Sequence, residues 1–259
     1  MKPAEYRRMF EAEESQWWYA GQRQVAAALL EPWARGKRGL RLLDAGCGSG
    51  FNLVALGRLG SAFGIDLAPE AIRFCRERGV RAVRASVLRM PLADAAFDVV
   101  TSFDVIYHDW VPDDRAAVAE MARVLRPGGL LLVRVPALEA LRGAHDAEVL
   151  TRRRYTRAEL CALLESCGLA VERASYCNSL LLPLLFVRRT LDRLLGRKGS
   201  DVGFLPAPVE SLFRRLMAVE AWCVRRGFRF PIGASVVVLA LKTGGAAPHP
   251  RIPPSLRPE

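Results

Sequence analysis

A short apolar run that ends in an acid and leads into three glycines places the strongest constraint on how this chain can fold. The run Leu40 to Leu43 predicts a buried strand, because short apolar runs bounded by glycine are typical of a parallel sheet core. Asp44 follows, and the glycines at 46, 48 and 50 permit a sharp turn and the close approach of a ligand. Leucines at helical spacing in residues 52–60 predict a helix next. A strand, a glycine turn and a helix together predict a nucleotide-binding corner.

The spacing of the glycines narrows the choice of ligand class. A dinucleotide site has the pattern Gly-x-Gly-x-x-Gly, but here the third glycine comes one position early and Phe51 stands where that pattern needs glycine. The carboxylate of Asp44 would repel a diphosphate and attract a cationic amino group. The corner therefore suits a ligand that has a ribose and an ammonium group but no phosphate.

A second acid follows at the end of the next predicted strand. Ala62 to Ile65 form an apolar run that ends in Asp66, and Pro69 begins the following helix. An acid at this point of a doubly wound sheet is placed to accept both ribose hydroxyls. The patterns Asp44–Gly50, Gly64–Pro69 and 125–129 (Leu-Arg-Pro-Gly-Gly), taken in order, resemble the motifs of class I S-adenosylmethionine-dependent methyltransferases. The resemblance covers residues 17–242.

This resemblance implies a fold and a division of the chain. The expected fold is α/β, a doubly wound seven-stranded Rossmann-like methyltransferase sheet, with the last strand antiparallel and a helical insertion between strands 6 and 7. We expect a single domain over residues 1–242, with an N-terminal helical lid (1–35) and an insertion that forms a substrate lid (179–230). Residues 243–259 are rich in Pro and Gly, which predicts a disordered tail.

The resemblance also implies S-adenosyl-L-methionine as the cofactor. Asp44 and the glycine loop would hold its methionine end, and Asp66 its ribose. Many family members have an aspartate for the adenine amino group where this chain has Ser86. The full set of expected cofactor-binding residues is Asp44, Gly46, Cys47, Gly48, Gly50, Asp66, Leu67, Ser86, Val87, Phe103 and Asp104.

Several aromatic and histidine residues are candidates for the acceptor site. Trp17, Trp18 and Tyr19 are adjacent, so they cannot share one helix face, and they form either a hydrophobic clasp or a lid over the substrate. Arg23, Tyr107 and Tyr155 complete the expected substrate residues. His108 follows the fourth predicted strand and His145 lies in a later loop. Either histidine could be the general base, since the pKa of histidine lies near working pH, and His108 could equally orient the cofactor.

Composition excludes other classes of function. The net charge is +11, but the basic residues are mostly arginines spread along the chain, with no RNA-binding module. We therefore expect a small-molecule acceptor and no nucleic acid. The six cysteines and three histidines do not cluster, which argues against a metal site and against disulfides. The charged N-terminus is not a signal peptide, so a cytoplasmic protein is expected.

The predicted insertion has an apolar helix face followed by arginines. Leu180 to Phe186 are nearly all apolar, and Arg188, Arg189, Arg193 and Arg197 come after them. Such a segment, residues 180–197, packs on the core or a dimer partner, makes a peripheral membrane contact, or binds a lipid-like acceptor. The predicted function is O- or N-methylation of a small-molecule or lipid-like acceptor. The alternative is a non-catalytic protein with this fold that docks a membrane or partner through the insertion. No oligomeric state is predicted.

Overall fold

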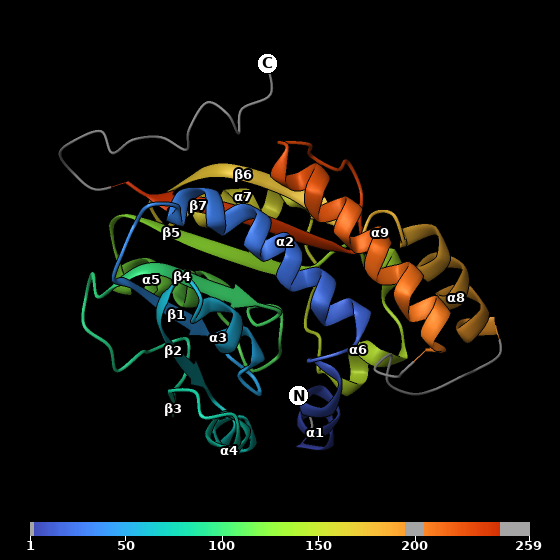
Figure 1. Cartoon of the computed structure of the whole chain (residues 1–259), viewed down its shortest axis with the longest axis horizontal. Coiled ribbons are helices and arrows are strands. Elements are labelled where there is room, and N and C mark those ends of the chain that lie inside the picture. Colours follow the sequence, from blue (N-terminus) through green and yellow to red (C-terminus); the bar gives the residue numbers. More distant parts are fainter. Residues whose placement is uncertain (1–2, 195–204, 244–259) are drawn as a thin grey trace.

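A seven-stranded mixed sheet with the strand order β3-β2-β1-β4-β5-β7-β6 forms the centre of the protein (Figure 1). The computed structural model describes residues 3–194 and 205–243. Pairing is parallel from β3 to β5, while β7 runs antiparallel to both β5 and β6. The strands are β1 (Leu40–Ala45), β2 (Gly60–Asp66), β3 (Ala82–Arg84), β4 (Phe97–Phe103), β5 (Leu125–Pro136), β6 (Leu169–Cys177) and β7 (Ser235–Lys242). The predicted sheet and its antiparallel last strand are confirmed.

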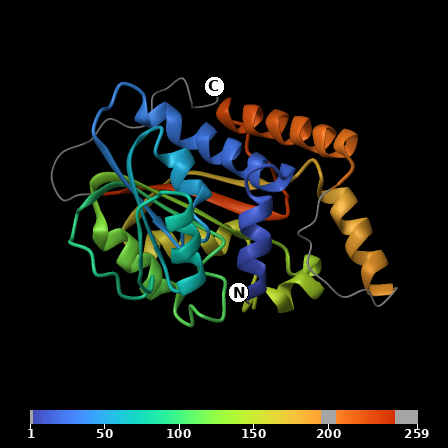
Figure 2. The ribbon, with the colours of Figure 1, turned by 60° about the horizontal axis from the view of Figure 1, so that its bottom comes forward.

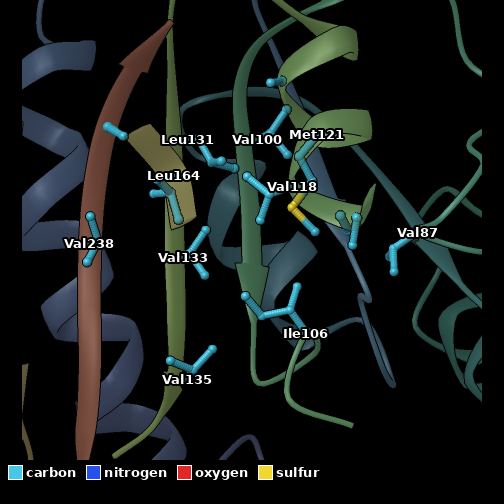
Figure 3. Close-up of a cluster of buried hydrophobic side chains, with 14 of the residues drawn as sticks. Val87, Val100, Ile106, Val118, Met121, Leu131, Val133, Val135, Leu164 and Val238 are labelled. Carbon is cyan, nitrogen blue, oxygen red and sulfur yellow. The ribbon is translucent and has the colours of Figure 1, made fainter. Parts of the chain in front are cut away.

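Helices cover both faces of this sheet. They are α1 (Pro3–Ala12), α2 (Trp17–Ala34), α3 (Phe51–Leu56), α4 (Pro69–Glu77), α5 (Asp114–Val124), α6 (Ala144–Glu148), α7 (Arg157–Ser166), α8 (Leu182–Leu194) and α9 (Ala207–Arg225), with a short 3-10 turn at Glu139–Leu141. On one face, α5 and α7 bury a core of branched aliphatic side chains against the central strands (Figure 3). Burial of these side chains supplies the main drive to fold. Thr156 and Glu159 form a capping box that begins α7.

The opposite face is covered by α2 and α9, which lie side by side (Figure 1). Their approach depends on Gly21, because a Cβ there would lie 2.6 Å from Cβ of Met217. Trp17 and Phe213 pack edge to face at 5.1 Å between ring centroids at one end of this contact. The N-terminal segment and the insertion between β6 and β7 are therefore joined in space, although about 200 residues separate them.

Several element boundaries differ from those that the sequence predicts. β5 begins at Leu125, directly after α5, although the composition of the Arg-Pro-Gly-Gly segment by itself favours a turn. The reason is the neighbouring strand: Arg126 pairs with Asp98 at 2.6 Å, and a Cβ on Gly129 would lie 2.8 Å from the Asp98 carbonyl oxygen. The backbone thus runs against β4 across a bulge between Phe97 and Val99. The predicted helix 52–60 is shorter, since β2 already begins at Gly60.

The insertion is helical, as predicted: it contains α8 and α9, and α8 extends beyond the sheet (Figure 2). Leu184, Phe186 and Val187 are each about half exposed on it. No helix within residues 3–194 and 205–243 is long and apolar enough to cross a membrane. The membrane contact at 180–197 stays a prediction. Residues 195–204 of the insertion, which include the end of that segment, lie outside the described residues. The expected tail beyond residue 243 lies outside them as well.

Candidate active site

One cavity of about 830 Å³ opens at the carboxyl ends of the parallel strands, where ligands of open α/β sheets bind. Its wall joins two halves. The glycine turn, β2 and the segment after β3 form one half. The other half is formed by α2, the segments after β4 and β5, and helices α8 and α9. A volume of this size is at the upper end for small-molecule sites and can hold a nucleoside together with a second molecule.

The glycine turn has the backbone that the sequence predicts. Gly46, Gly48 and Gly50 all have positive φ values, of 89°, 54° and 89°. A Cβ on Gly46 would lie 2.2 Å from a methyl group of Val105, so alanine is excluded by space as well as by conformation. Gly46, Cys47 and Gly48 line the cavity, whereas Gly50 faces Cys75 and Val80 and acts within the turn.

Asp66 lines the cavity at the end of β2. Its carboxylate accepts hydrogen bonds from the backbone N–H of Gly48 and of Ala68, both at 2.9 Å. The hydroxyl of Tyr6 donates a third, at 3.4 Å. Burial raises the pKa of Asp66, while these hydrogen bonds oppose the rise by stabilising the carboxylate. Asp66 therefore fixes the glycine turn and offers oxygens to a ligand hydroxyl, as Tyr6 shows.

Asp44 lies one layer deeper than expected. It is fully buried and is not part of the cavity wall. One carboxylate oxygen accepts from the Thr101 hydroxyl at 2.6 Å, and the other has no partner among the described residues. Burial is the main cause that raises the pKa of Asp44 to about 7. Asp44 lies behind Gly46, and one of its carboxylate oxygens is unpaired. A cationic group in the cavity would therefore be attracted to this carboxylate at short range.

The raised pKa of Asp44 predicts how stability depends on pH. A folded-state pKa above the unfolded value of 3.8 means that the folded chain favours the protonated acid. The contribution of Asp44 to stability is therefore full below about pH 4 and is lost as the pH rises through about 7. We expect Asp44→Asn to become more stable relative to wild type between pH 4 and 8, by up to roughly 4 kcal/mol. Urea denaturation at both pH values measures this, with the exposed Asp94→Asn as control; an unchanged difference contradicts it.

Helix α1 covers the cofactor half of the cavity. Tyr6 and Met9 from this helix, and Glu13 directly after it, line the cavity. Glu13 accepts from the Ser49 hydroxyl and, at 3.2 Å, from the backbone N–H of Phe51, and it pairs with Arg78 at 2.9 Å. These contacts fasten α1 to the glycine turn. Sequence reasoning did not find these residues, because nothing in an isolated charged helix indicates which loop it covers.

The acceptor half combines an apolar wall with two buried ion pairs. Trp17, Trp18 and Tyr19 all line it, together with Leu181, Leu184, Leu185, Val209 and Phe213 of the insertion. Arg134 on β5 pairs with Asp104, with Nε 3.2 Å from a carboxylate oxygen. Arg154 binds Asp146 through both carboxylate oxygens, at 2.9 and 3.0 Å. Arg188 and Arg189 of α8 also line the cavity, but most of the lining of this half is apolar.

Some of the expected catalytic and substrate residues line the cavity, and others lie outside its wall. Tyr107 and His108 line the cavity, with ring centroids 4.2 Å apart and ring planes inclined by 31°. Arg23 lies outside the wall, over the ring of Phe51 at 4.4 Å. Tyr155 also lies outside, where its hydroxyl donates to Asp114 at 2.6 Å. The side chain of His145 lies outside the described residues, although its backbone is in α6.

The remaining expected cofactor residues all lie in the wall: Leu67, Ser86, Val87, Phe103 and Asp104. The hydroxyl of Ser86 accepts from the backbone N–H of Leu88 at 3.2 Å, which turns the chain after β3 around the cavity. The groups present thus fit a nucleoside with a cationic amino acid end. In such a ligand, Asp66 would be placed for the ribose, the segment 85–87 for the base, and the glycine turn in front of Asp44 for the ammonium.

Comparisons with known proteins agree with this geometry. The family described as "Methyltransferase domain" matches residues 43–133. A probable S-adenosylmethionine-dependent methyltransferase of Mycolicibacterium smegmatis is 33% identical over 164 residues, which cover 61% of this chain and 62% of that protein. The ubiquinone biosynthesis O-methyltransferase of Xanthomonas oryzae is 33% identical over 198 residues, which cover 64% of this chain and 80% of that protein.

Solved structures share the fold. A putative sarcosine dimethylglycine methyltransferase from Galdieria sulphuraria has a TM-score of 0.56 at 20% identity, and the match covers 85% of this chain and 84% of that one. A putative methyltransferase solved with the Haloferax volcanii activator Trm112 has a TM-score of 0.60 at 20% identity, covering 95% and 96%. At these identities the structures support the fold alone. The family follows from the sequence relatives: this chain belongs to the class I S-adenosylmethionine-dependent methyltransferases, enzymes that use S-adenosylmethionine as cofactor.

Proposed function

We propose that this enzyme methylates an oxygen or nitrogen of a small molecule that carries an apolar tail. The observation that carries the proposal is the shape of the cavity. Its cofactor half continues without a break into a wall formed by Leu181, Leu184, Leu185, Val209 and Phe213. An alkyl or isoprenoid chain would bury its surface there at about 25 cal/mol per Å². One relative is named for a part in ubiquinone biosynthesis, which agrees with this choice of acceptor.

The chain positions the acceptor more than it activates it. The bound cofactor supplies a methyl group that is already strongly electrophilic. The protein's task is then to hold the acceptor atom in line with that methyl group and to exclude water. The aromatic residues Trp17, Trp18 and Tyr19 contribute to both tasks. Asp66 and the glycine turn fix the other partner from the far side of the cavity.

His108 is the residue that we propose as proton acceptor. Its side chain is hydrogen-bonded to the backbone near Val149 and Leu150, while Nδ1 has no partner among the described residues. Burial lowers the pKa of His108 to about 4, so the ring is neutral at working pH. Such a weak base does not deprotonate a free alcohol. It can take the proton in the transition state, while the acceptor oxygen gains the methyl group, because the hydroxyl proton becomes strongly acidic as that bond forms.

We expect His108→Ala to lower kcat by about 100-fold, the lower end for loss of a general base, with the affinity for S-adenosylhomocysteine unchanged. Stopped assays of label transfer at saturating cofactor measure kcat, and calorimetry measures the affinity. Gln24→Ala is the control, with full turnover expected, because Gln24 is exposed on α2 and does not line the cavity. Full turnover in His108→Ala would remove the residue from the mechanism.

The tail itself is tested with labelled cofactor and a bacterial cell extract. After incubation with the enzyme, the extract is partitioned between organic solvent and water. We expect the transferred methyl label in the organic fraction, because an acceptor with an apolar tail partitions there. Label that appears only in the aqueous fraction contradicts the proposed acceptor, and absence of transfer to any fraction contradicts the proposed reaction.

A further inference from the structure

Two buried amide side chains line the inner end of the acceptor half. Gln22 on α2 is 3% exposed, and Asn178, directly after β6, is 1% exposed. Both face the cavity, and each has an atom without a hydrogen-bond partner among the described residues: Nε2 of Gln22 and Oδ1 of Asn178. Buried polar atoms in proteins are nearly always hydrogen-bonded, so two unpartnered atoms in one cavity wall indicate a missing ligand group.

The two amides converge on one point of the sheet. Oε1 of Gln22 lies 4.0 Å from the thiol of Cys177, the residue before Asn178. Nδ2 of Asn178 donates to the hydroxyl of Ser235 at 3.4 Å. Ser235 pairs with both Cys177 and Pro136 across the strands and lines the same cavity. A helix near the N-terminus and two strand ends near the C-terminus thus bring both amides to the same place.

Asn178 is held firmly in this position. Its φ of 57° is in the left-handed region, which asparagine tolerates better than most residues. The carboxylate of Glu220, fully buried on α9, accepts from the backbone N–H of Asn178, from Ser179 at 2.8 Å and from Leu180 at 3.2 Å. Glu220 is therefore a positioning residue: it fixes the turn that aims the Asn178 side chain at the cavity.

We propose that Gln22 and Asn178 recognise a neutral hydroxyl group of the acceptor. The hydrogen bonds to Cys177 and Ser235 assign a free N–H donor to Gln22 and a free carbonyl acceptor to Asn178. A hydroxyl accepts from the first and donates to the second, which neither a carboxylate nor an ammonium group can do. Arg134, a cation of the same cavity wall, is already paired with Asp104. This inference rests on the proposed acceptor and adds the polar group at its inner end.

The experiment compares two probes that differ in one hydroxyl, 4-hexylphenol and hexylbenzene. Quenching of tryptophan fluorescence in the presence of S-adenosylhomocysteine reports binding, since Trp17 and Trp18 line the cavity. We expect the wild-type protein to bind the phenol about tenfold more tightly or better, the effect of a hydrogen bond to a buried group. Gln22→Met and Asn178→Gly should each reduce this preference to near unity with little change for hexylbenzene. Glycine suits the φ of Asn178.

Gln24→Met is the matched control, because Gln24 is exposed two residues along the same helix. It should keep the wild-type preference. Equal binding of both probes by the wild-type protein, binding of neither, or an unchanged preference in both variants overturns the assignment. S-adenosylhomocysteine separates this failure from the failure of the proposed function: a protein that does not bind it, and transfers no label, fails at the earlier step. Retained affinity for it in each variant also shows that the variant has folded.

Discussion

Asp66→Ala is expected to lower the affinity for S-adenosylhomocysteine by about 100-fold. In the structure the Asp66 carboxylate faces the cavity and also holds the backbone N–H groups of Gly48 and Ala68. Two hydrogen bonds from ribose hydroxyls to a carboxylate contribute about 1.5 kcal/mol each at the low end, and each 1.4 kcal/mol is a factor of ten. Isothermal titration calorimetry measures the change directly.

The control for this experiment is Asp94→Ala. Asp94 is largely exposed, and it does not line the cavity. Its loss should leave the affinity unaltered. Asp66→Ala also leaves two backbone donors of the turn unpaired, so circular dichroism and a urea titration are needed to show that the variant is folded. An affinity within threefold of wild type in a folded variant would show that Asp66 is not the ribose partner.

The second large effect is expected from the buried ion pair between Arg154 and Asp146 in the acceptor half. Arg154→Leu should lower the free energy of unfolding by about 3–5 kcal/mol, because it leaves the Asp146 carboxylate buried without its charged partner. Both side chains are less than one tenth exposed. Arg154 also donates to the carbonyl oxygen of Ala137 at 2.8 Å, so it ties α6 to the end of β5. Urea denaturation measures the loss.

Two further variants separate the charge from the packing. Arg153→Leu removes the neighbouring arginine, which is 37% exposed and pairs with Asp114 and Glu159 at the surface. Pairs of that kind contribute about 0–1 kcal/mol, so little loss is expected. The double variant Arg154→Leu/Asp146→Leu should recover much of the stability, because no buried charge remains. If the single and double variants are equally unstable, the ion pair is not the cause.

Local patterns in the sequence predicted the parts of the site that depend on a few neighbouring residues. The spacing of the glycines predicted a sharp turn, and all three have positive φ values. Asp66 stands at the end of β2, as its motif predicts. The capping box of α7 likewise formed from four consecutive residues. In each case the conformation is fixed by backbone sterics and short-range hydrogen bonds, which act within one turn of chain.

Predictions that needed a distant partner were less complete. The segment 126–129 joined β5 because Asp98 on β4 lies beside it. Arg23 and Tyr155 turned away from the cavity because Phe51 and Asp114 offered them partners. Gln22 and Asn178 gave no signal at all, since a glutamine on a helix and an asparagine after a strand are ordinary residues in both places.

The sequence by itself determined the family, the cofactor and the backbone of the glycine turn, because these rest on contiguous motifs with stringent backbone requirements. Only the tertiary structure decided the acceptor half. There α2 packs along α9 through Gly21, which places the aromatic residues against the insertion and brings Gln22 to Asn178. The physical reason is that such a wall is made by packing between segments about 200 residues apart, and packing complementarity leaves no local pattern in a single sequence.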